Sequence, residues 1–260
     1  MRAISLAKFE KGIVNEDAAI TKENAIAVSD GAGGGGVFAE RWSHYLVKHV
    51  PEKPINNYKS FDKWIDSIWE PFYNSCEEEA QKIGGLFLNK FYDEGSFATL
   101  VAIWSKGEWI CYGDSVAFCY NKKTGELQHS FTRLSDFNNS PYLINCKDPL
   151  NKEGFRSGKF KIDKNGIVFA ASDTLAHYIL MMYEVSHKNK FAEDIQEAIN
   201  AQTRNSNYIK TALALEKVDF ERDVLSKLKN CYTWPFLRNH IKGLMKKGLI
   251  GQDDYSLVFM

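Results

Sequence analysis

The chain has 260 residues, of which 44% are hydrophobic and 25% charged, and its 33 basic and 33 acidic side chains give a formal net charge of zero. This balance argues against general nucleic-acid binding, which needs a basic surface. No apolar run approaches the ~18 residues that span a bilayer, and the N-terminus has too short an apolar stretch for a signal peptide. We therefore expect a cytoplasmic protein with no membrane partner, folded as a single domain over residues 1–260.

The first strong pattern along the chain is a strand followed by glycines. The apolar run Ala25–Ser29 predicts a buried strand that ends at Asp30. The glycines at 31 and 33–36 predict a tight loop that exposes the main chain, and residues 37–50 then predict a helix. Taken alone, this pattern leaves two interpretations open. The glycines cradle a nucleotide phosphate at the helix start, or Asp30 holds a metal ion beside a flexible carbonyl.

Further elements follow in order. Residues 60–83 predict a long helix, which Pro71 should kink or split. Residues 131–160 are polar and loop-like, whereas residues 190–248 predict several helices of unassigned role. Apolar runs rich in β-branched and aromatic residues predict strands at 96–104, 108–112, 116–120, 166–172 and 254–260. The five cysteines show no CxxC spacing, which indicates reduced thiols and not a zinc site or a disulfide frame.

Acidic residues recur where these strands begin or end. Asp30, Asp114 and Asp173 follow or close strand-like runs, whereas Glu16 and Asp253 precede them. If neighbouring strands are antiparallel, both kinds of end lie at the same edge of a sheet. Carboxylates gathered there would raise one another's pKa unless a cation neutralised them.

Sites whose ligands are all oxygen atoms suit Mg²⁺ or Mn²⁺. The sequence has no comparable set of His and Cys residues that would favour zinc. Two such ions can share a carboxylate, lower the pKa of a water and support in-line attack on phosphorus. The structural alternative is that acids favour turns at strand ends. The neighbouring acids Asp17 and Asp254 are as well suited to orienting a loop as to binding an ion.

Six short segments occur in the order found in metal-dependent protein phosphatases of the PP2C type, and the resemblance runs from about residue 15 to the last residue. They are Asn15-Glu16-Asp17, Val28–Gly31, Gly95–Thr99, Gly113-Asp114-Ser115, Ala171-Ser172-Asp173 and Asp253–Ser256. The resemblance implies an α+β fold: a four-layer α-β-β-α sandwich of two antiparallel sheets flanked by helices. It also implies hydrolysis of phosphoserine and phosphothreonine in a phosphoprotein by a water that bridges two divalent metals.

Carried over position by position, the resemblance implies a set of site residues. Asp30 bridges two Mn²⁺ or Mg²⁺ ions, and Glu16 and the main-chain carbonyl of Gly31 complete the first. Asp173 and Asp253 hold the second ion. Asp30, Asp173 and Asp253 form the catalytic set, and Asp114 matches the acid of a third, weaker metal site.

The sequence departs from the family pattern at four places, one of which is Ala32 after Gly31, where many members have His or Met. The usual phosphate-gripping arginine is replaced by Gly12, so Lys11 becomes the nearest candidate for binding the substrate phosphate. Thr174 follows Asp173 where glycine is usual, and Val116 follows Ser115 where arginine is common.

These departures motivate an alternative: a catalytically weak or silent relative that binds phosphoproteins or another signalling partner. Nucleotide binding is disfavoured, because the glycine run follows an acid and has no GxxxxGK[ST] motif. None of the six histidines forms a close pair suited to a metal, and His177, four residues after Asp173, is the first candidate for a proton donor.

Overall fold

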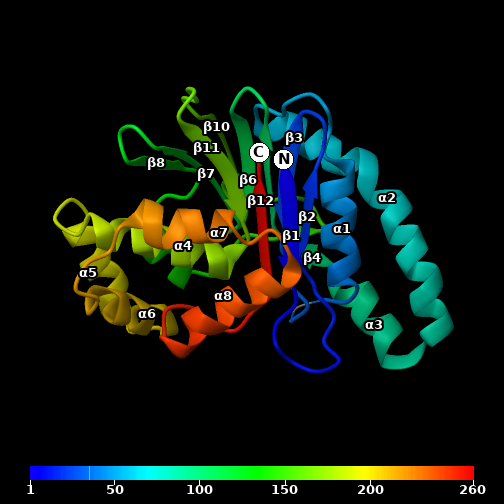
Figure 1. The fold of residues 1–260 in the computed structure, drawn as a ribbon. Helices are drawn as coiled ribbons and strands as arrows, with labels where there is room; N and C mark the ends of the chain where they lie inside the picture. The colour runs from blue at the N-terminus through cyan, green and yellow to red at the C-terminus, as the bar shows by residue number, and fades with distance from the viewer. Residues whose placement is uncertain (35) are drawn as a thin grey trace.

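The computed structural model describes residues 1–34 and 36–260, and within them two five-stranded antiparallel sheets face each other (Figure 1). Gly35, in the middle of the predicted glycine loop, lies outside the described residues. Sheet A has the order β1 (Arg2–Leu6), β12 (Tyr255–Phe259), β11 (Gly166–Ala171), β7 (Val116–Asn121), β8 (Glu126–His129). Sheet B has the order β10 (Phe155–Lys159), β6 (Glu108–Tyr112), β5 (Leu100–Trp104), β3 (Ala25–Ser29), β2 (Ala18–Thr21). A small pair joins β4 (Phe97–Ala98) to β9 (Ile144–Asn145).

Helices cover the outer face of each sheet, as Figure 1 shows on its two sides. Sheet B is covered by α1 (Ala39–His49), α2 (Tyr58–Ile83) and α3 (Gly85–Glu94). Sheet A is covered by α4 (Asp173–Ser186), α5 (Ala192–Asn200), α6 (Arg204–Leu213), the π-helix Glu221–Leu225, α7 (Ser226–Lys229) and α8 (Trp234–Lys246). Short 3₁₀ turns occur at Leu134–Asn138 and Lys152–Gly154.

Three buried apolar clusters hold these layers together. The central cluster lies between the sheets, where Val28 and Val101 of sheet B pack with Cys119 and Val258 of sheet A. The other two lie between each sheet and its helices. Small and β-branched side chains at the centre let the two sheets approach closely, and the larger aromatics fill the helix layers. The predicted four-layer α-β-β-α sandwich is confirmed.

Helix α2 differs from the prediction in one respect, because it runs through Pro71 without splitting. Pro71 removes a main-chain hydrogen bond and crowds the preceding turn. However, it lies on the exposed side, and the buried stripe continues in helical register from Ile65 and Ile68 to Phe72 and Cys76. Packing of this stripe on both sides of the proline holds the helix in one piece.

Several elements were not predicted from the sequence. They are β1, β8, α3, β9 and β10, the last two within residues that we expected to form a loop. Strand β10 pairs with β6 along its whole length, from Phe155 opposite Tyr112 to Lys159 opposite Glu108. Its side chains are half-buried or exposed, as suits an edge strand, so it lacks the apolar run that marks an interior strand.

Two further findings bear on the expectations above. All five cysteines are buried and free, as expected for packing residues. Among the described residues, no helix combines the length and the apolar character that crossing a membrane requires.

Candidate metal centre

The acids singled out in the sequence lie at one end of the sandwich. In sheet B, Ala18 pairs with Ser29, so Asp17 just before β2 and Asp30 just after β3 are at adjacent strand ends. In sheet A, Ala171 lies opposite both Val116 and Leu257, which puts the strand ends that lead to Asp114, Asp173 and Asp253 side by side. The turn between β6 and β7 crosses from sheet B to sheet A at this end. Antiparallel pairing therefore brings acids from distant parts of the chain to one rim.

These carboxylates are close enough to raise one another's pKa. Burial is the largest cause for Asp30 and holds its pKa well above the ordinary value, and Asp17, Asp173, Asp114 and Asp253 raise it further. Asp173 is also raised well above its ordinary pKa, first by burial and then by Asp114, Asp253 and Asp17. The pKa of Asp114 is raised to about 6, mainly by burial. Mutual repulsion of this kind is the expected signature of a carboxylate cluster without its cation.

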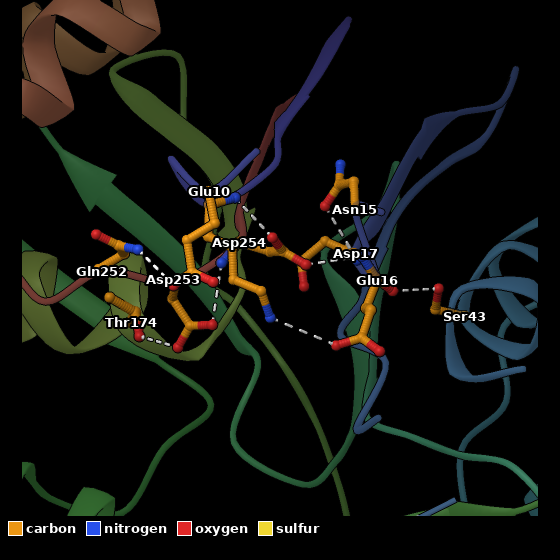
Figure 2. A network of polar contacts seen from close by, with 10 residues as sticks. Glu10, Asn15, Glu16, Asp17, Ser43, Thr174, Gln252, Asp253 and Asp254 are labelled. Atoms are coloured by element: carbon orange, nitrogen blue, oxygen red, sulfur yellow. Dashed lines mark hydrogen bonds and ion pairs between the residues drawn. The ribbon is translucent and has the colours of Figure 1, made fainter. Parts of the chain in front are cut away.

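The neighbouring acids Asp17 and Asp254 have different roles, which the sequence could not separate. Asp254 accepts hydrogen bonds from the main-chain nitrogens of Lys8 and Glu16, both at 2.7 Å, and so anchors the N-terminal segment to the last strand. Figure 2 shows Asp254 between Asp253 and Glu16. Asp17 is 1% exposed, and neither of its carboxylate oxygens has a hydrogen-bond partner among the described residues. Burial raises the pKa of Asp17 to about 7, against smaller lowering effects of the Ser172 and Ser256 hydroxyls.

Glu16 lies beside this cluster and contacts a lysine. Its carboxylate is 3.8 Å from Nζ of Lys8, and its main-chain carbonyl accepts from the Ser43 hydroxyl at 2.6 Å (Figure 2). The glycines of the loop make room for it. A Cβ at Gly31 would meet the Glu16 carbonyl oxygen at 2.6 Å, and one at Gly33 would meet its Oε1 at 1.9 Å. The glycine run thus allows close packing of the main chain around Glu16.

Other residues of the six segments hold the acids in place. The Thr99 hydroxyl accepts from the Asp30 main-chain nitrogen at 3.1 Å and shares a 2.7 Å hydrogen bond with Ser115. Thr174 donates from its hydroxyl to Oδ2 of Asp253 at 2.9 Å. The residue that departs from the family pattern therefore orients one of the candidate ligands. The recurrence of Ser and Thr in these segments was the only sequence signal for these supports.

Divalent cations fit this donor set. Its atoms are carboxylate oxygens, the Asp17 oxygens are buried without partners, and Asp30, Asp114 and Asp173 remain partly open to solvent. Hard cations prefer such oxygens and would relieve the repulsion among them. Across residues 1–34 and 36–260, no three His, Cys, Asp or Glu side chains are already gathered around one metal position. The acids lie at the same rim, and their side chains would have to move to surround an ion.

Basic side chains near the rim differ from the sequence expectation. Lys11 is exposed and has no ion pair with a described residue, whereas Lys8 pairs with Glu16. Arg156 of β10 lies beside Asp114 and partly lowers its pKa, and it lines a cleft of about 170 Å³ next to that acid. Sequence reasoning missed both Lys8 and Arg156, since neither belongs to one of the six segments.

His177 does not suit the role of proton donor. It is buried in α4, its Nε2 has no hydrogen-bond partner among the described residues, and burial lowers its pKa to about 4. The imidazole is therefore neutral at pH 7 and holds no readily donated proton. It contacts the ring of Phe137 edge-on, at 5.3 Å between ring centroids.

Comparison with known proteins gives a clear result for the fold. No family model matches the sequence, and no curated protein matches it. Among solved structures, the catalytic domain of the serine/threonine protein phosphatase PstP in complex with two manganese ions matches with a TM-score of 0.53 and 14% identity, over 99% of this chain and 95% of that one. The Mycobacterium tuberculosis serine/threonine phosphatase PstP/Ppp gives a TM-score of 0.52 and 14% identity over 99% and 96% of the two chains. PppA from Pseudomonas aeruginosa gives a TM-score of 0.51 and 16% identity over 99% of this chain and 95% of that one.

The chain therefore has the fold of the PP2C-type serine/threonine phosphatases, and the resemblance noted in the sequence is confirmed at that level. The matches extend over nearly the whole of both chains. At these identities the comparison establishes the fold, and the chemistry has to be argued from the residues of the rim.

We predict that replacing Asp17 by Asn removes a pH-dependent cost from the metal-free protein. The pKa of this carboxyl is higher in the folded than in the unfolded chain, so its full contribution to stability is present below about pH 4, where it is protonated in both states. This contribution is lost as pH rises to about 7, because the unfolded chain loses the proton first. The loss is roughly 1.4 kcal/mol for each unit by which the pKa is raised. The free energy of unfolding of Asp17→Asn, compared with that of the unchanged chain, should therefore increase from pH 4.5 to pH 7.5. Urea denaturation in the presence of a chelator measures this difference.

Asp66→Asn, an exposed change on α2, serves as the control and should show no pH-dependent difference. If the difference in the free energy of unfolding between Asp17→Asn and the unchanged chain were the same at pH 4.5 and pH 7.5, the pKa of Asp17 would not be raised in the folded chain.

We also predict that Gly33→Ala weakens manganese binding by about tenfold, because the new Cβ takes the space of the Glu16 carboxylate. Gly34→Ala is the matched control, since no atom of the described residues lies within 4 Å of its Cβ position. Isothermal titration with Mn²⁺ compares the two variants. Equal affinity in both would argue against Glu16 as a ligand.

Proposed function

We propose that this chain is a metal-dependent phosphoprotein phosphatase that hydrolyses phosphoserine and phosphothreonine. The observation that carries the proposal is the convergence of Asp17, Asp30, Asp114, Asp173 and Asp253 on one rim of a PP2C-type sandwich. One protein with this fold is described in complex with two manganese ions, which supports the same cofactor here.

The proposed protein ligands follow the sequence prediction, with one addition. Asp30 would be shared by two Mn²⁺ or Mg²⁺ ions. Glu16 and the Gly31 carbonyl would hold one ion, Asp173 and Asp253 would hold the other, and Asp114 would contribute to a weaker third site. We add Asp17, because its carboxylate oxygens are buried and have no hydrogen-bond partner among the described residues. The bound ions would lower the pKa of a water to near neutrality and withdraw charge from the phosphoryl oxygens.

The residues of the chain have their own parts in this reaction. Thr174 and Thr99 fix the Asp253 carboxylate and the Asp30 main chain, so that the ligands do not have to reorganise during turnover. Lys8 and Arg156 place positive charge on two sides of the rim, where a phosphate dianion would arrive. The cleft beside Asp114 offers space for the peptide that carries the phosphate.

We expect manganese-dependent release of phosphate from para-nitrophenyl phosphate. Asp30→Asn and Asp173→Asn should each lower turnover by about a hundredfold or more, because losing even an outer partner of a ligand costs ten- to hundredfold. Asp66→Asn is the matched control and should keep full activity. A steady-state assay with excess manganese measures all three.

No turnover in excess manganese would overturn the enzymatic proposal. The alternative is a catalytically weak or silent relative that binds phosphoproteins, and it is motivated by Gly12 in place of the family's arginine and by Thr174 after Asp173. Calorimetry with a phosphoserine peptide distinguishes the two, since binding without hydrolysis would identify the alternative.

The identity of the phosphate-binding cation gives a separate prediction. The sequence suggests Lys11, whereas the position of Lys8 near Glu16 makes it the better candidate. We expect Lys8→Ala to raise KM roughly fivefold, as for a partly exposed ion pair, and Lys11→Ala to leave KM unchanged. A raised KM in Lys11→Ala with an unchanged KM in Lys8→Ala would support the sequence prediction of Lys11. An unchanged KM in both variants would leave Arg156 as the cation that binds the phosphate.

A further inference from the structure

A cleft of about 580 Å³ lies away from the acidic rim, among the helices that cover sheet A. It is bounded by α4, by the segment from Leu215 to Lys227 and by α8. Sites for small organic ligands typically have volumes of about 300–1,000 Å³. The cleft is therefore large enough for a ligand with a ring and several polar groups.

The floor of the cleft is apolar and includes a flat ring. Tyr178 and Met182 of α4 lie on one side, and Leu244 of α8 and Leu249 lie on the other. These side chains are buried in the cluster beneath the cleft, so they form a fixed surface. Leu215 also lines the cleft and is 40% exposed, so an aromatic ring or a base would pack against it and bury further apolar area.

The walls of the cleft carry mainly positive charge. Arg222 and Lys227 lie 2.8 Å and 3.8 Å from the Asp223 carboxylate, so this acid is already paired. Lys217 and Lys247 also line the cleft and have no ion pair with a described residue. Glu216 is the one further acid of the lining. The balance favours an anion, and phosphate groups suit paired lysines.

The cleft also contains an unused polar atom. Nε2 of His240 is buried and has no hydrogen-bond partner among the described residues. Burial, and after it the charges of Lys227 and Lys247, lower the pKa of His240 to about 4, so the ring is neutral at pH 7. A buried polar atom without a partner is costly, and a ligand hydroxyl or amino group would satisfy it.

The wall that carries Arg222 and Asp223 is π-helical, from Glu221 to Leu225. Such segments are rare and often occur at functional sites. The cleft also adjoins the elements that lead to the rim, since α4 begins at Asp173 and Leu249 lies four residues before Asp253.

We propose that this cleft is a second binding site, which takes a ring-bearing organic phosphate. The ring packs on Leu215, the phosphate lies between Lys217 and Lys247, and a ligand hydroxyl or amino group reaches His240. The proposal does not depend on catalysis at the acidic rim.

The test measures binding by the full chain in the presence of a chelator, because an acidic rim without divalent ions repels phosphate. The probes are the four nucleoside monophosphates, phenyl phosphate, inorganic phosphate and an uncharged nucleoside. We expect at least one organic phosphate to raise the thermal midpoint and to bind in calorimetry. The double change Lys217→Ala with Lys247→Ala should weaken its binding by about tenfold or more. Lys246→Ala, an exposed neighbour on α8 outside the cleft, is the matched control and should bind as the unchanged chain does.

Other outcomes would overturn the proposal. The first is that no organic phosphate binds at millimolar concentration. The second is that the double variant binds as tightly as the unchanged chain, and the third is that Lys246→Ala loses as much affinity as the double variant. Inorganic phosphate binding as tightly as the organic phosphates would exclude a role for the apolar floor. An uncharged nucleoside binding as tightly would exclude the lysines as the source of affinity.

Discussion

The constraint on which this structure depends is the gathering of carboxylates at one end of two packed sheets. Each acid loses water there and repels its neighbours, which raises the pKa of Asp30 and Asp173 well above the ordinary value. Lys8 and Arg156 supply positive charge at the edges only. The fold tolerates this arrangement because the apolar layers fix the strand ends, and a divalent cation is the natural means of relieving it.

A second layer of hydrogen bonds holds the acids where they are. Asp254 binds two main-chain nitrogens from the N-terminal segment, and Thr99 and Thr174 orient Asp30 and Asp253. These contacts join β12, the last strand, to the segment that precedes β2. Residues separated by more than two hundred positions thus lie side by side at this rim.

Much of the fold could be predicted from the sequence, because interior strands are apolar runs and α2 has a clear buried stripe. Edge strand β10 and short helix α3 could not, since their side chains are largely exposed and their pairing depends on the rest of the fold. At the site, the spacing placed the acids at strand ends, but it could not distinguish Asp17 from Asp254. That difference depends on which carboxylate meets main-chain nitrogens and which is buried without them. The ligand roles of Glu16, Asp30, Gly31, Asp114, Asp173 and Asp253 stay predictions, as do the single domain and the cytoplasmic location.

The central claim is that the acidic rim binds a pair of hard cations. The most direct measurement is anomalous diffraction from crystals grown with manganese, recorded near the manganese absorption edge. The account predicts two strong peaks at the end of the sandwich, one on each side of Asp30, with Asp173 and Asp253 beside one and Glu16 beside the other. A map with no peak at this rim in saturating manganese would contradict it.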